Sequence, residues 1–459
     1  MKTSYTLILG LFLISLTIKL NAQTTVPQVI SSNQTWNAAG SPYIVNQNIL
    51  IKAGSTVKVM PGTKIRGTGS YRIIVEGSLE ARGTKDSIIK LDTISFEFIK
   101  GAVEYDFKTN KGSVFSYCFF DANGSGGAMT IQNPPSLLIN NCKFSNCMWC
   151  IYSTVSAIDT NTVRIEKSFF DGSKMNGYVA DISGNNYNLE MDECIVKSMT
   201  LYLTTWNTIT HSYFYNWPYF SGLKLSTGLK RATLKCNTFR KFKSSILEFT
   251  AYNSKAEIII VGNTFDSADY HMNYYVMGKF DGKFICKNNN FLQYNKNSVY
   301  VTGGSTPGYA DTLIFTKNYW GTTTSSQITK GIWDINDDIS VAGLVDYSNY
   351  QSTMITDCIT DDSEEDFVGT GSPATFREIN NSAFSIYPNP ANGYIKIESS
   401  NIAVNSYKIF TLEGKLIMNC KLENKDGIID VSSLKTGFYM LEANNNGATS
   451  GTQKLIINR

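Results

Sequence analysis

Charged residues and histidines are scarce in this sequence. Only 17% of its 459 residues are Asp, Glu, Lys or Arg, and the formal net charge is +3. So small a charge, with no long basic run, argues against nucleic acid as a partner. The two histidines, His211 and His271, provide little material for general-base catalysis. We expect His211 to have a structural role.

Common catalytic motifs and helical patterns are also missing from the sequence. It contains no Gly-x-Ser-x-Gly, no His-Glu-x-x-His and no phosphate-binding loop. No amphipathic helical stretch separates the strand-like runs described below. Beyond residues 1–22 no apolar run is long enough to cross a bilayer, so we expect no transmembrane segment in the mature chain.

The first 22 residues have the pattern of a signal peptide. Lys2 provides the positive start, the run from Leu7 to Ile18 is apolar, and Asn21-Ala22 ends in a small residue. We therefore predict that residues 1–22 are a signal peptide and that the protein is exported.

An aromatic residue recurs about every 25 residues through the middle of the chain, and a small or amide residue lies two positions before each one. The aromatic series, with one aliphatic exception, is Phe120, Phe144, Phe170, Val196, Phe214, Phe239, Phe265, Phe291 and Trp320. The second series is Cys118, Cys142, Ser168, Cys194, Ser212, Asn237, Asn263, Asn289 and Asn318. A period in the twenties with two positions in step is typical of a solenoid.

The runs around each aromatic residue indicate strands. Glu257-Ile258-Ile259-Ile260-Val261 is one example, and such runs end in Asn, Gly, Ser or Asp. A coil of short strands and turns predicts a parallel β-helix with coils about 4.8 Å apart. We expect the aromatics to form one interior column and the Cys, Ser and Asn residues an internal ladder.

Two segments resemble known coils. The stretch from Ile51 to Thr63 and the run Asn318-Tyr319-Trp320-Gly321 are similar to the first and last coils of right-handed parallel β-helix proteins. The expected fold class is all-β: a right-handed parallel β-helix solenoid over residues 23–350, followed by a small C-terminal β-sandwich. The resemblance implies a fold and no particular reaction.

A change of composition follows the solenoid. The run Asp361-Asp362-Ser363-Glu364-Glu365-Asp366 is acidic and precedes a Gly- and Ser-containing stretch. We interpret residues 351–383 as a linker, with calcium binding by the acidic run as the alternative.

The last segment carries the most specific resemblance. The opening Tyr387-Pro388-Asn389-Pro390, the run from Leu434 to Tyr439 and the basic and apolar end 453–459 resemble the sorting domain of the type IX secretion system. The resemblance implies a β-sandwich at 384–459 and the type IX secretion machinery of Bacteroidetes-type bacteria as partner. It also implies an extracellular or outer-membrane cell-surface location. An ordinary β-sandwich such as a carbohydrate-binding module is the alternative.

The nine cysteines do not need a disulfide framework to explain them. Cys118, Cys142 and Cys194 fall in the ladder series, where a small buried apolar residue fits. Export permits a disulfide, and Cys142, Cys147 and Cys150 are close in sequence. Without a nearby His, this spacing is a weak zinc signal.

Acid–base chemistry has one candidate arrangement. The position after each aromatic carries Asp171 and Lys197 in adjacent coils, and Arg240 and Asp266 in another pair. We interpret these as ion pairs across the coils. The alternative is a polysaccharide lyase, in which Lys197 takes a proton from a uronate and Arg240 or calcium neutralises its carboxylate.

Surface aromatic residues favour a binding role. Trp149, Tyr219 and Tyr270 each lie five residues after the core column, and Tyr215 and Trp217 belong to a dense aromatic segment. Rings spaced along a rod can stack on sugars, which predicts carbohydrate binding by these five residues. Packing beneath a loop is the other interpretation.

The cluster Asp334, Asp337 and Asp338 is a calcium candidate that lacks the Gly and terminal Glu of an EF-hand loop. A turn that caps the open end of the solenoid is the preferred interpretation, and we expect no other cofactor. The whole sequence predicts an exported, non-catalytic β-helix that binds polysaccharide or acts in adhesion, with a uronate lyase as the alternative function.

Overall fold

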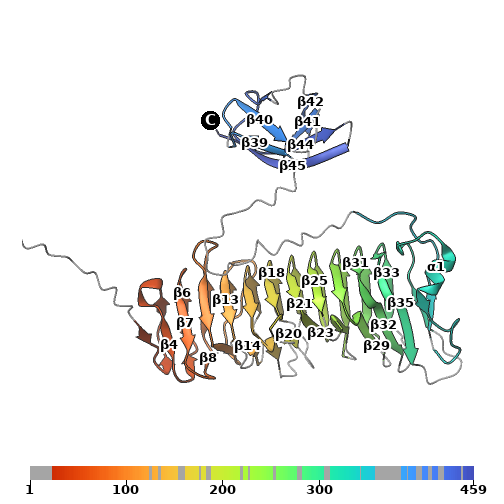
Figure 1. Cartoon of the computed structure of the whole chain (residues 1–459). Helices are drawn as coiled ribbons and strands as arrows, with labels where there is room; N and C mark the ends of the chain where they lie inside the picture. The colour runs from red at the N-terminus through yellow and green to blue at the C-terminus, as the bar shows by residue number, and fades with distance from the viewer. Residues whose placement is uncertain are drawn as a thin grey trace, which may run out of the picture. The chain divides into compact units, whose positions relative to one another are not determined.

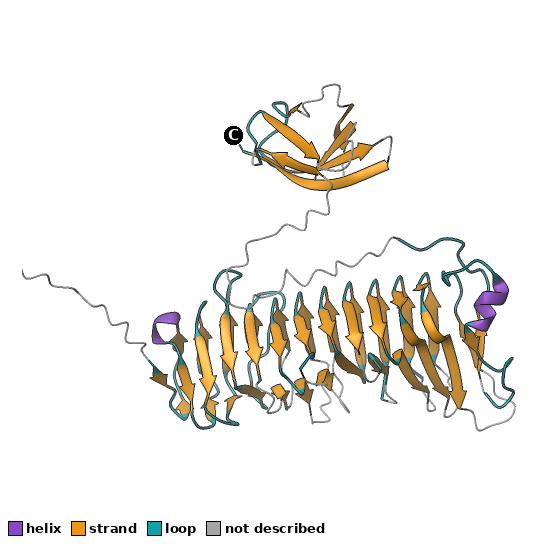
Figure 2. Ribbon diagram, in the orientation of Figure 1, coloured by secondary structure: helices purple, strands orange, loops and turns teal. Residues whose placement is uncertain are grey.

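Each sequence repeat forms one coil of three short strands, and each strand pairs in parallel with its counterpart in the next coil (Figures 1 and 2). In this computed structural model the strands build three parallel sheets, called A, B and C here, with 12, 13 and 11 strands. Strand numbers rise by three along sheets A and C, and along sheet B as far as β35, because each coil contributes one strand to each sheet. The prediction of an all-β chain with a parallel β-solenoid is confirmed.

The structure describes residues 23–122, 127–132, 136–153, 161–174, 177–181, 188–217, 221–225, 228–251, 255–276, 282–303, 311–341, 343–356, 384–389, 391–399, 406–411, 416–421, 428–445 and 448–458. The expected signal peptide, residues 357–383 of the expected linker, and Tyr219 lie outside these ranges.

The strands of the three sheets are short. Sheet A consists of β1 (Thr24–Thr25), β4 (Tyr43–Val45), β7 (Lys64–Gly67), β10 (Ile89–Asp92), β13 (Cys118–Asp121), β16 (Lys143–Ser145), β19 (Phe169–Asp171), β22 (Ile195–Lys197), β25 (Tyr213–Trp217), β28 (Thr238–Phe242), β31 (Thr264–Asp266) and β34 (Asn290–Phe291). Sheet B consists of β2 (Val29–Ile30), β5 (Ile49–Ile51), β8 (Arg72–Val75), β11 (Ser95–Phe98), β14 (Gly127–Ile131), β17 (Trp149–Ser153), β20 (Gly177–Asp181), β23 (Met199–Leu203), β26 (Leu223–Leu225), β29 (Ser245–Ala251), β32 (Ala268–Val276), β35 (Tyr294–Gly303) and β37 (Ile332–Trp333). Sheet C consists of β3 (Gln34–Trp36), β6 (Thr56–Val59), β9 (Ser78–Arg82), β12 (Val114–Ser116), β15 (Leu137–Asn140), β18 (Thr162–Glu166), β21 (Asn188–Asp192), β24 (Trp206–Thr210), β27 (Arg231–Lys235), β30 (Glu257–Val261) and β33 (Lys283–Lys287).

The aromatic series forms the interior column that its period predicts. Phe120, Phe144 and Phe170 are in register, and their rings are nearly parallel with centroids 4.4 and 4.7 Å apart. Val196 interrupts the stack and is 1% exposed. A second stack runs from Phe214 through to Trp320, with successive centroids 4.6 to 5.1 Å apart. Burying each Phe stabilises the fold by about 1.5–3 kcal/mol, so this column is a major part of the core.

A ladder of side chains completes the backbone hydrogen bonding at the corner between sheets C and A. The backbone N–H of Asn237 donates to Asn263 Oδ1 at 2.9 Å, and Asn263 Nδ2 donates to the Leu234 carbonyl at 2.9 Å. Asn289 repeats the pattern one coil further on, at 2.8 and 2.9 Å. In earlier coils a Ser takes the same place, since Ser168 Oγ accepts the Cys142 N–H at 3.1 Å.

The corner residue just before each ladder position has a positive φ, as in Glu193 at 50° and Asn288 at 55°. This left-handed conformation turns the chain within a single residue. The turn leaves a buried backbone N–H and a buried carbonyl without strand partners, and the ladder side chains bond them. This need explains why a small or amide residue recurs at the ladder position.

The ladder cysteines are free thiols. Cys118, Cys142 and Cys194 are buried and unbridged, and so are Cys147 and Cys150. Burial raises the pKa of Cys194 to about 12, so it remains a neutral thiol. The three ladder cysteines are small and buried, as expected from the sequence. Their Sγ atoms also donate weak hydrogen bonds to the carbonyls of Ala81, Phe115 and Ile165, at 3.5 to 3.8 Å.

The C-terminal end of the solenoid carries β36 (Asp311–Ile314), β38 (Gly343–Asp346) and the short helix α1 (Ser325–Lys330). Strands β36 and β38 pair in parallel as a separate two-stranded sheet. Near the N-terminal end, a 3-10 turn spans Ala38–Gly40.

The chain divides into two compact units, residues 1–368 and 369–459. The second unit has one antiparallel sheet of β39 (Phe384–Tyr387), β40 (Tyr394–Ser399) and β43 (Ile428–Asp430). Its other sheet contains β42 (Leu416–Lys421), β41 (Ser406–Thr411), β44 (Gly437–Asn445) and β45 (Ala448–Ile457). Both sheets contribute to one core, which includes Ile395, Ile409 and Leu455. This arrangement agrees with the expected small β-sandwich.

We predict that Asn263→Leu destabilises the solenoid by about 2–6 kcal/mol, because it leaves a buried N–H and a buried carbonyl unpaired. Asn263→Ser should cost less, since a Ser oxygen can accept the Asn237 N–H as Ser168 does for Cys142. Urea denaturation checks both changes, with exposed Thr208→Ala as a control expected to shift stability by less than about 0.5 kcal/mol. Equal losses for Leu and Ser would contradict the role of the ladder.

Candidate functional site

The lyase candidates lie in one outward column of sheet A. The register aligns Lys197 with Tyr215, and Tyr215 with Arg240. Arg240 Nε lies 3.2 Å from Asp266 Oδ2, so the expected ion pair between coils is present. Lys197 Nζ lies 5.7 Å from the ring centroid of Tyr215. The Tyr215 ring therefore separates the two proposed lyase residues, and the Arg240 charge is already engaged by a carboxylate.

Over its described residues 213–217, the dense aromatic segment does not form a continuous surface. Trp217 is 2% exposed and belongs to the main core of the solenoid. The expectation that its ring is presented to a sugar is wrong, because the ring packs inward. Tyr215 is half-buried on sheet A, where its ring centroid is 5.0 Å from that of Tyr213.

Sheet B carries the richer aromatic surface. Its outer face brings Trp149 of β17 beside Tyr178 of β20, with ring planes 10° apart and centroids 6.5 Å apart. Tyr152 lies 5.7 Å from Trp149, and Tyr202 of β23 lies 5.3 Å from Tyr178. All four rings are half-buried, so each leaves part of its surface to solvent. We call these four residues the first aromatic cluster.

A second aromatic cluster occupies the far part of the same sheet. Tyr270 of β32 stacks on Tyr300 of β35, with centroids 4.9 Å apart. Trp333 of β37 lies 6.3 Å from Tyr300. Lys296 Nζ lies 5.2 Å from the Tyr270 ring and pairs with Asp269 at 3.0 Å. The second cluster therefore combines rings with fixed charges.

Polar side chains separate the two clusters. The register aligns Lys224, Glu248 and Asn273 on β26, β29 and β32. Lys224 Nζ lies 4.0 Å from Glu248 Oε2 and 5.7 Å from the ring of Tyr202. Ser221 Oγ also donates to Glu248. At about 4.8 Å per strand, the surface from β17 to β37 extends roughly 34 Å along the sheet.

The sequence located two members of this surface and missed the others. Trp149 and Tyr270 were predicted, whereas the partners Tyr178, Tyr202 and Tyr300 were not. Trp149 and Tyr270 each lie five residues after a core aromatic, an offset that the other rings do not share. Tyr178 follows Phe170 by eight residues and Tyr300 follows Phe291 by nine. Tyr178 pairs in register with Trp149, whereas Tyr300 pairs with Asn273 and so lies at a different position along its strand from Tyr270. Aligning the strands of sheet B by register identifies Tyr178 opposite Trp149, but it does not identify Tyr202 or Tyr300, whose rings reach their neighbours from other register positions.

The calcium candidates act as turn acceptors. Asp334 is 3% exposed, and its two oxygens accept the N–H groups of Asn336 and Val345, each at 2.9 Å. Asp338 accepts both the N–H and the hydroxyl of Ser340, and these bonds lower its carboxyl pKa. Within the described residues, no group of three His, Cys, Asp or Glu side chains is placed to hold a metal.

The two histidines are in different environments. His211 lies at an exposed corner, with Nδ1 2.8 Å from Asp192 Oδ1. His271 is fully buried, with Nδ1 2.9 Å from Ser298 Oγ and Nε2 2.8 Å from the Gln293 carbonyl. Burial lowers the pKa of His271 to about 4, so the ring is neutral at pH 7.

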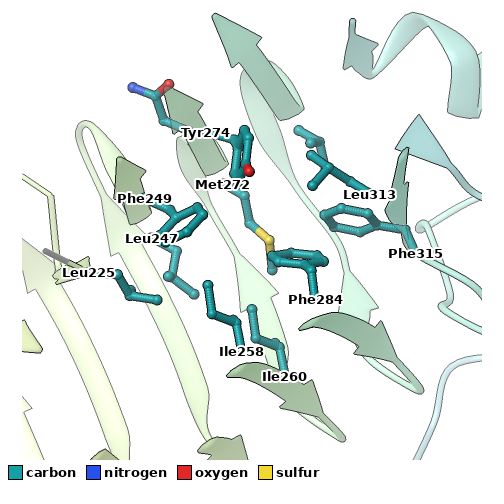
Figure 3. A pocket seen from close by; sticks show the side chains of 12 residues that line it. Leu225, Leu247, Phe249, Ile258, Ile260, Met272, Tyr274, Phe284, Leu313 and Phe315 are labelled. Atoms are coloured by element: carbon teal, nitrogen blue, oxygen red, sulfur yellow. The ribbon is translucent and has the colours of Figure 1, made fainter. Parts of the chain in front are cut away.

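One internal cavity lies in the core between sheets B and C (Figure 3). Its volume is about 20 Å³, and apolar side chains such as Phe284 and Phe315 surround it. This space is about that of one water molecule, which excludes a sugar. This cavity is therefore not a sugar site, and the outer faces of the described coils are the candidate surfaces for ligand recognition.

The antiparallel C-terminal unit has a known relative. Residues 385–458 match the family model of the secretion system C-terminal sorting domain. The unit is a type IX secretion sorting domain. No curated protein matches the chain. The expectation drawn from Tyr387-Pro388-Asn389-Pro390 and the later runs is confirmed.

The sorting domain determines the route of the protein. It is handled by the type IX secretion machinery and marks the chain for export, followed by attachment to the cell surface or release. No helix in the described part of the chain is long and apolar enough to span a bilayer. The solenoid is the cargo of this route.

Acidification should destabilise the solenoid through His271. The unfolded chain binds a proton near pH 6.5, whereas the buried ring binds one only near pH 4, so stability is lost as the pH falls through that window. Relative to pH 7, we expect a loss of about 2–3 kcal/mol at pH 4.5 from this residue. Urea midpoints at several pH values measure it, and His271→Gln should have a flatter profile. Identical pH profiles for the wild-type protein and His271→Gln would contradict the assignment of this acid sensitivity to His271.

Deleting residues 384–459 should leave the solenoid in the periplasm, because the type IX machinery then has no sorting domain to recognise. Cell fractionation and immunoblotting measure the distribution. A full-length chain with Thr208→Ala is the control and should be exported normally. Recovery of the truncated chain outside the cell at the full-length level would refute the assignment.

Proposed function

We propose that the exported solenoid is a non-catalytic surface protein that binds a polysaccharide along the outer face of sheet B, in an adhesin-like role. The observation that carries the proposal is the pair of aromatic clusters on one face, separated by a polar stretch. Sugar rings present C–H faces that stack on aromatic side chains, and their hydroxyls need polar partners.

The arrangement supports a linear ligand. Both clusters lie on strands of the same sheet, so a chain laid along the axis contacts the first cluster, then Lys224 and Glu248, then the second cluster. Half-buried rings are fixed by their neighbours and lose little conformational entropy on binding. The solenoid presents these rings on an open face. A polymer longer than the site can lie along such a face, because no cavity wall limits its length.

The lyase alternative has weaker support. Proton abstraction needs a base and a charge-neutralising group around one sugar. Lys197 and Arg240 are two strands apart, about 10 Å, with Tyr215 between them. They also lie on sheet A, away from both aromatic clusters.

The test is binding of the full-length protein to a panel of neutral and acidic polysaccharides. We expect Tyr202→Ala and Tyr300→Ala each to weaken binding about tenfold, because each removes one stacked ring. Phe119→Ala is the matched control, since Phe119 is half-buried on the outer face of sheet A, and it should bind as wild type.

The same samples should be assayed for unsaturated products by ultraviolet absorbance with alginate, pectate and glycosaminoglycans. Absence of binding across the panel, or equal weakening by the Phe119 change, would contradict the proposal. Product formation that is abolished by Lys197→Ala would replace it with the lyase.

A further inference from the structure

Sheet B carries few charged residues along its aromatic surface. From β17 to β37 the strands contain two lysines and three acidic residues, which are Lys224, Lys296, Asp181, Glu248 and Asp269. Acidic residues therefore outnumber lysines on the strands that hold both aromatic clusters. A surface of this composition has no excess positive charge with which to attract an anionic polymer.

Both lysines lie beside a carboxylate of a neighbouring strand. Lys224 Nζ is 4.0 Å from Glu248 Oε2, and Lys296 Nζ is 3.0 Å from Asp269 Oδ2. A hydrogen bond from Asn295, together with the Lys296 charge, lowers the pKa of the Asp269 carboxyl, so this group is ionised at neutral pH. An anionic group placed here would meet a lysine that is already ion-paired and a carboxylate that repels it.

The same pairing continues towards the N-terminal end of the sheet. Glu97 of β11 aligns through Thr130 with Tyr152 of the first aromatic cluster. Glu97 is 7% exposed, and Arg72 Nη1 lies 2.7 Å from its Oε2. Each Lys or Arg on the described strands of sheet B therefore has an acidic partner.

The rings recur once in each coil within a cluster. The centroids of Tyr178 and Tyr202 are 5.3 Å apart. Those of Tyr270 and Tyr300 are 4.9 Å apart, and Trp333 follows at 6.3 Å. The coil repeat of about 4.8 Å sets this spacing. One pyranose unit of an extended polysaccharide has nearly the same length, so successive sugars of a chain parallel to the axis meet successive coils.

We infer that the ligand of this face is an uncharged, extended polysaccharide that lies along the axis with about one sugar unit on each coil. The inference rests on the proposed polysaccharide-binding function and names the class of polymer. Rings of both clusters stack on sugar faces, and Lys224, Glu248 and Asn273 offer donors and acceptors to the hydroxyl groups between them.

Charge decides between polymer classes on such a face. A polyuronate or a sulfated chain would lose hydration of its charges here without gaining an unpaired cation. A neutral chain loses no charge hydration, and its hydroxyl groups can bond both members of an ion pair. The surface from β17 to β37 accommodates about seven units of such a chain.

The charge of the polymer is tested with matched pairs that share a backbone. The full-length protein is assayed with hydroxyethyl and carboxymethyl cellulose, and with methyl-esterified and free polygalacturonate, while xylan and mannan serve as further neutral polymers. We expect a neutral polymer to bind at least about tenfold more tightly than the charged ones. Its affinity should change less than about twofold between low and high salt.

Two other results are distinguishable. Tighter binding of a charged polymer, with weakening in high salt, would overturn the inference and leave the proposed function standing. Absence of binding to every polymer, neutral and charged, would remove the proposed function itself.

The role of the carboxylates is tested by combining Glu248→Gln with Asp269→Asn, which leaves the two lysines of the surface without acidic partners. We expect this double variant to bind the charged polymers about tenfold more tightly than wild type at low salt, and to lose the gain in high salt. Glu190→Gln is the control, because it removes a carboxylate from an ion pair with Arg164 on sheet C, and it should bind like wild type. No gain in the double variant, or an equal gain in the control, would contradict the inference.

The alignment of sugars with coils is tested by a length series of oligosaccharides cut from the neutral polymer that binds. Affinity should rise with each added unit up to about seven units, because each unit reaches another coil. An affinity that stops rising at two or three units would contradict the alignment.

Discussion

The corner between sheets C and A is the constraint on which the solenoid depends. One residue in the left-handed conformation turns the chain there, so the next N–H lies inside the coil without a strand partner. A side chain from the following coil supplies the acceptor, as Asn263 does for Asn237. Every coil thus needs its neighbour to complete its hydrogen bonds, which makes the stack cooperative.

The interior column and the ladder were predictable because they are the features that must repeat. Phe144 stacks on Phe170, and Asn289 bonds to Asn263, so a change at either position affects two coils. The column and ladder positions therefore recur at a nearly constant spacing in the sequence. The all-β, parallel β-helix fold also followed from the lack of helical patterns and from short runs such as 257–261.

The surface was harder to predict, because corner lengths vary and surface positions carry no fixed period. A constant offset found Trp149 and Tyr270 but missed Tyr178 and Tyr300. Trp217 looked like part of a surface group because the segment around it is aromatic, yet it packs into the core at 2% exposure.

The outer faces therefore differ in their roles. Sheet B presents two aromatic clusters to solvent, and sheet A carries a buried apolar cluster of Phe169, Ile195 and Tyr213, with Lys143 beside the Phe169 ring. The sorting domain is a separate compact unit that directs export and need not take part in recognition. This division lets one chain combine a rigid rod with a secretion signal.

The stacking of coils is tested most directly by distances between spin labels on the outer face of sheet C. One label replaces Lys58, and the second replaces Glu190, Thr208 or Thr233, which the register places five, six and seven strands away. The account predicts separations of about 24, 29 and 34 Å, rising by one coil spacing each time. Separations that do not rise in equal steps would contradict an in-register solenoid.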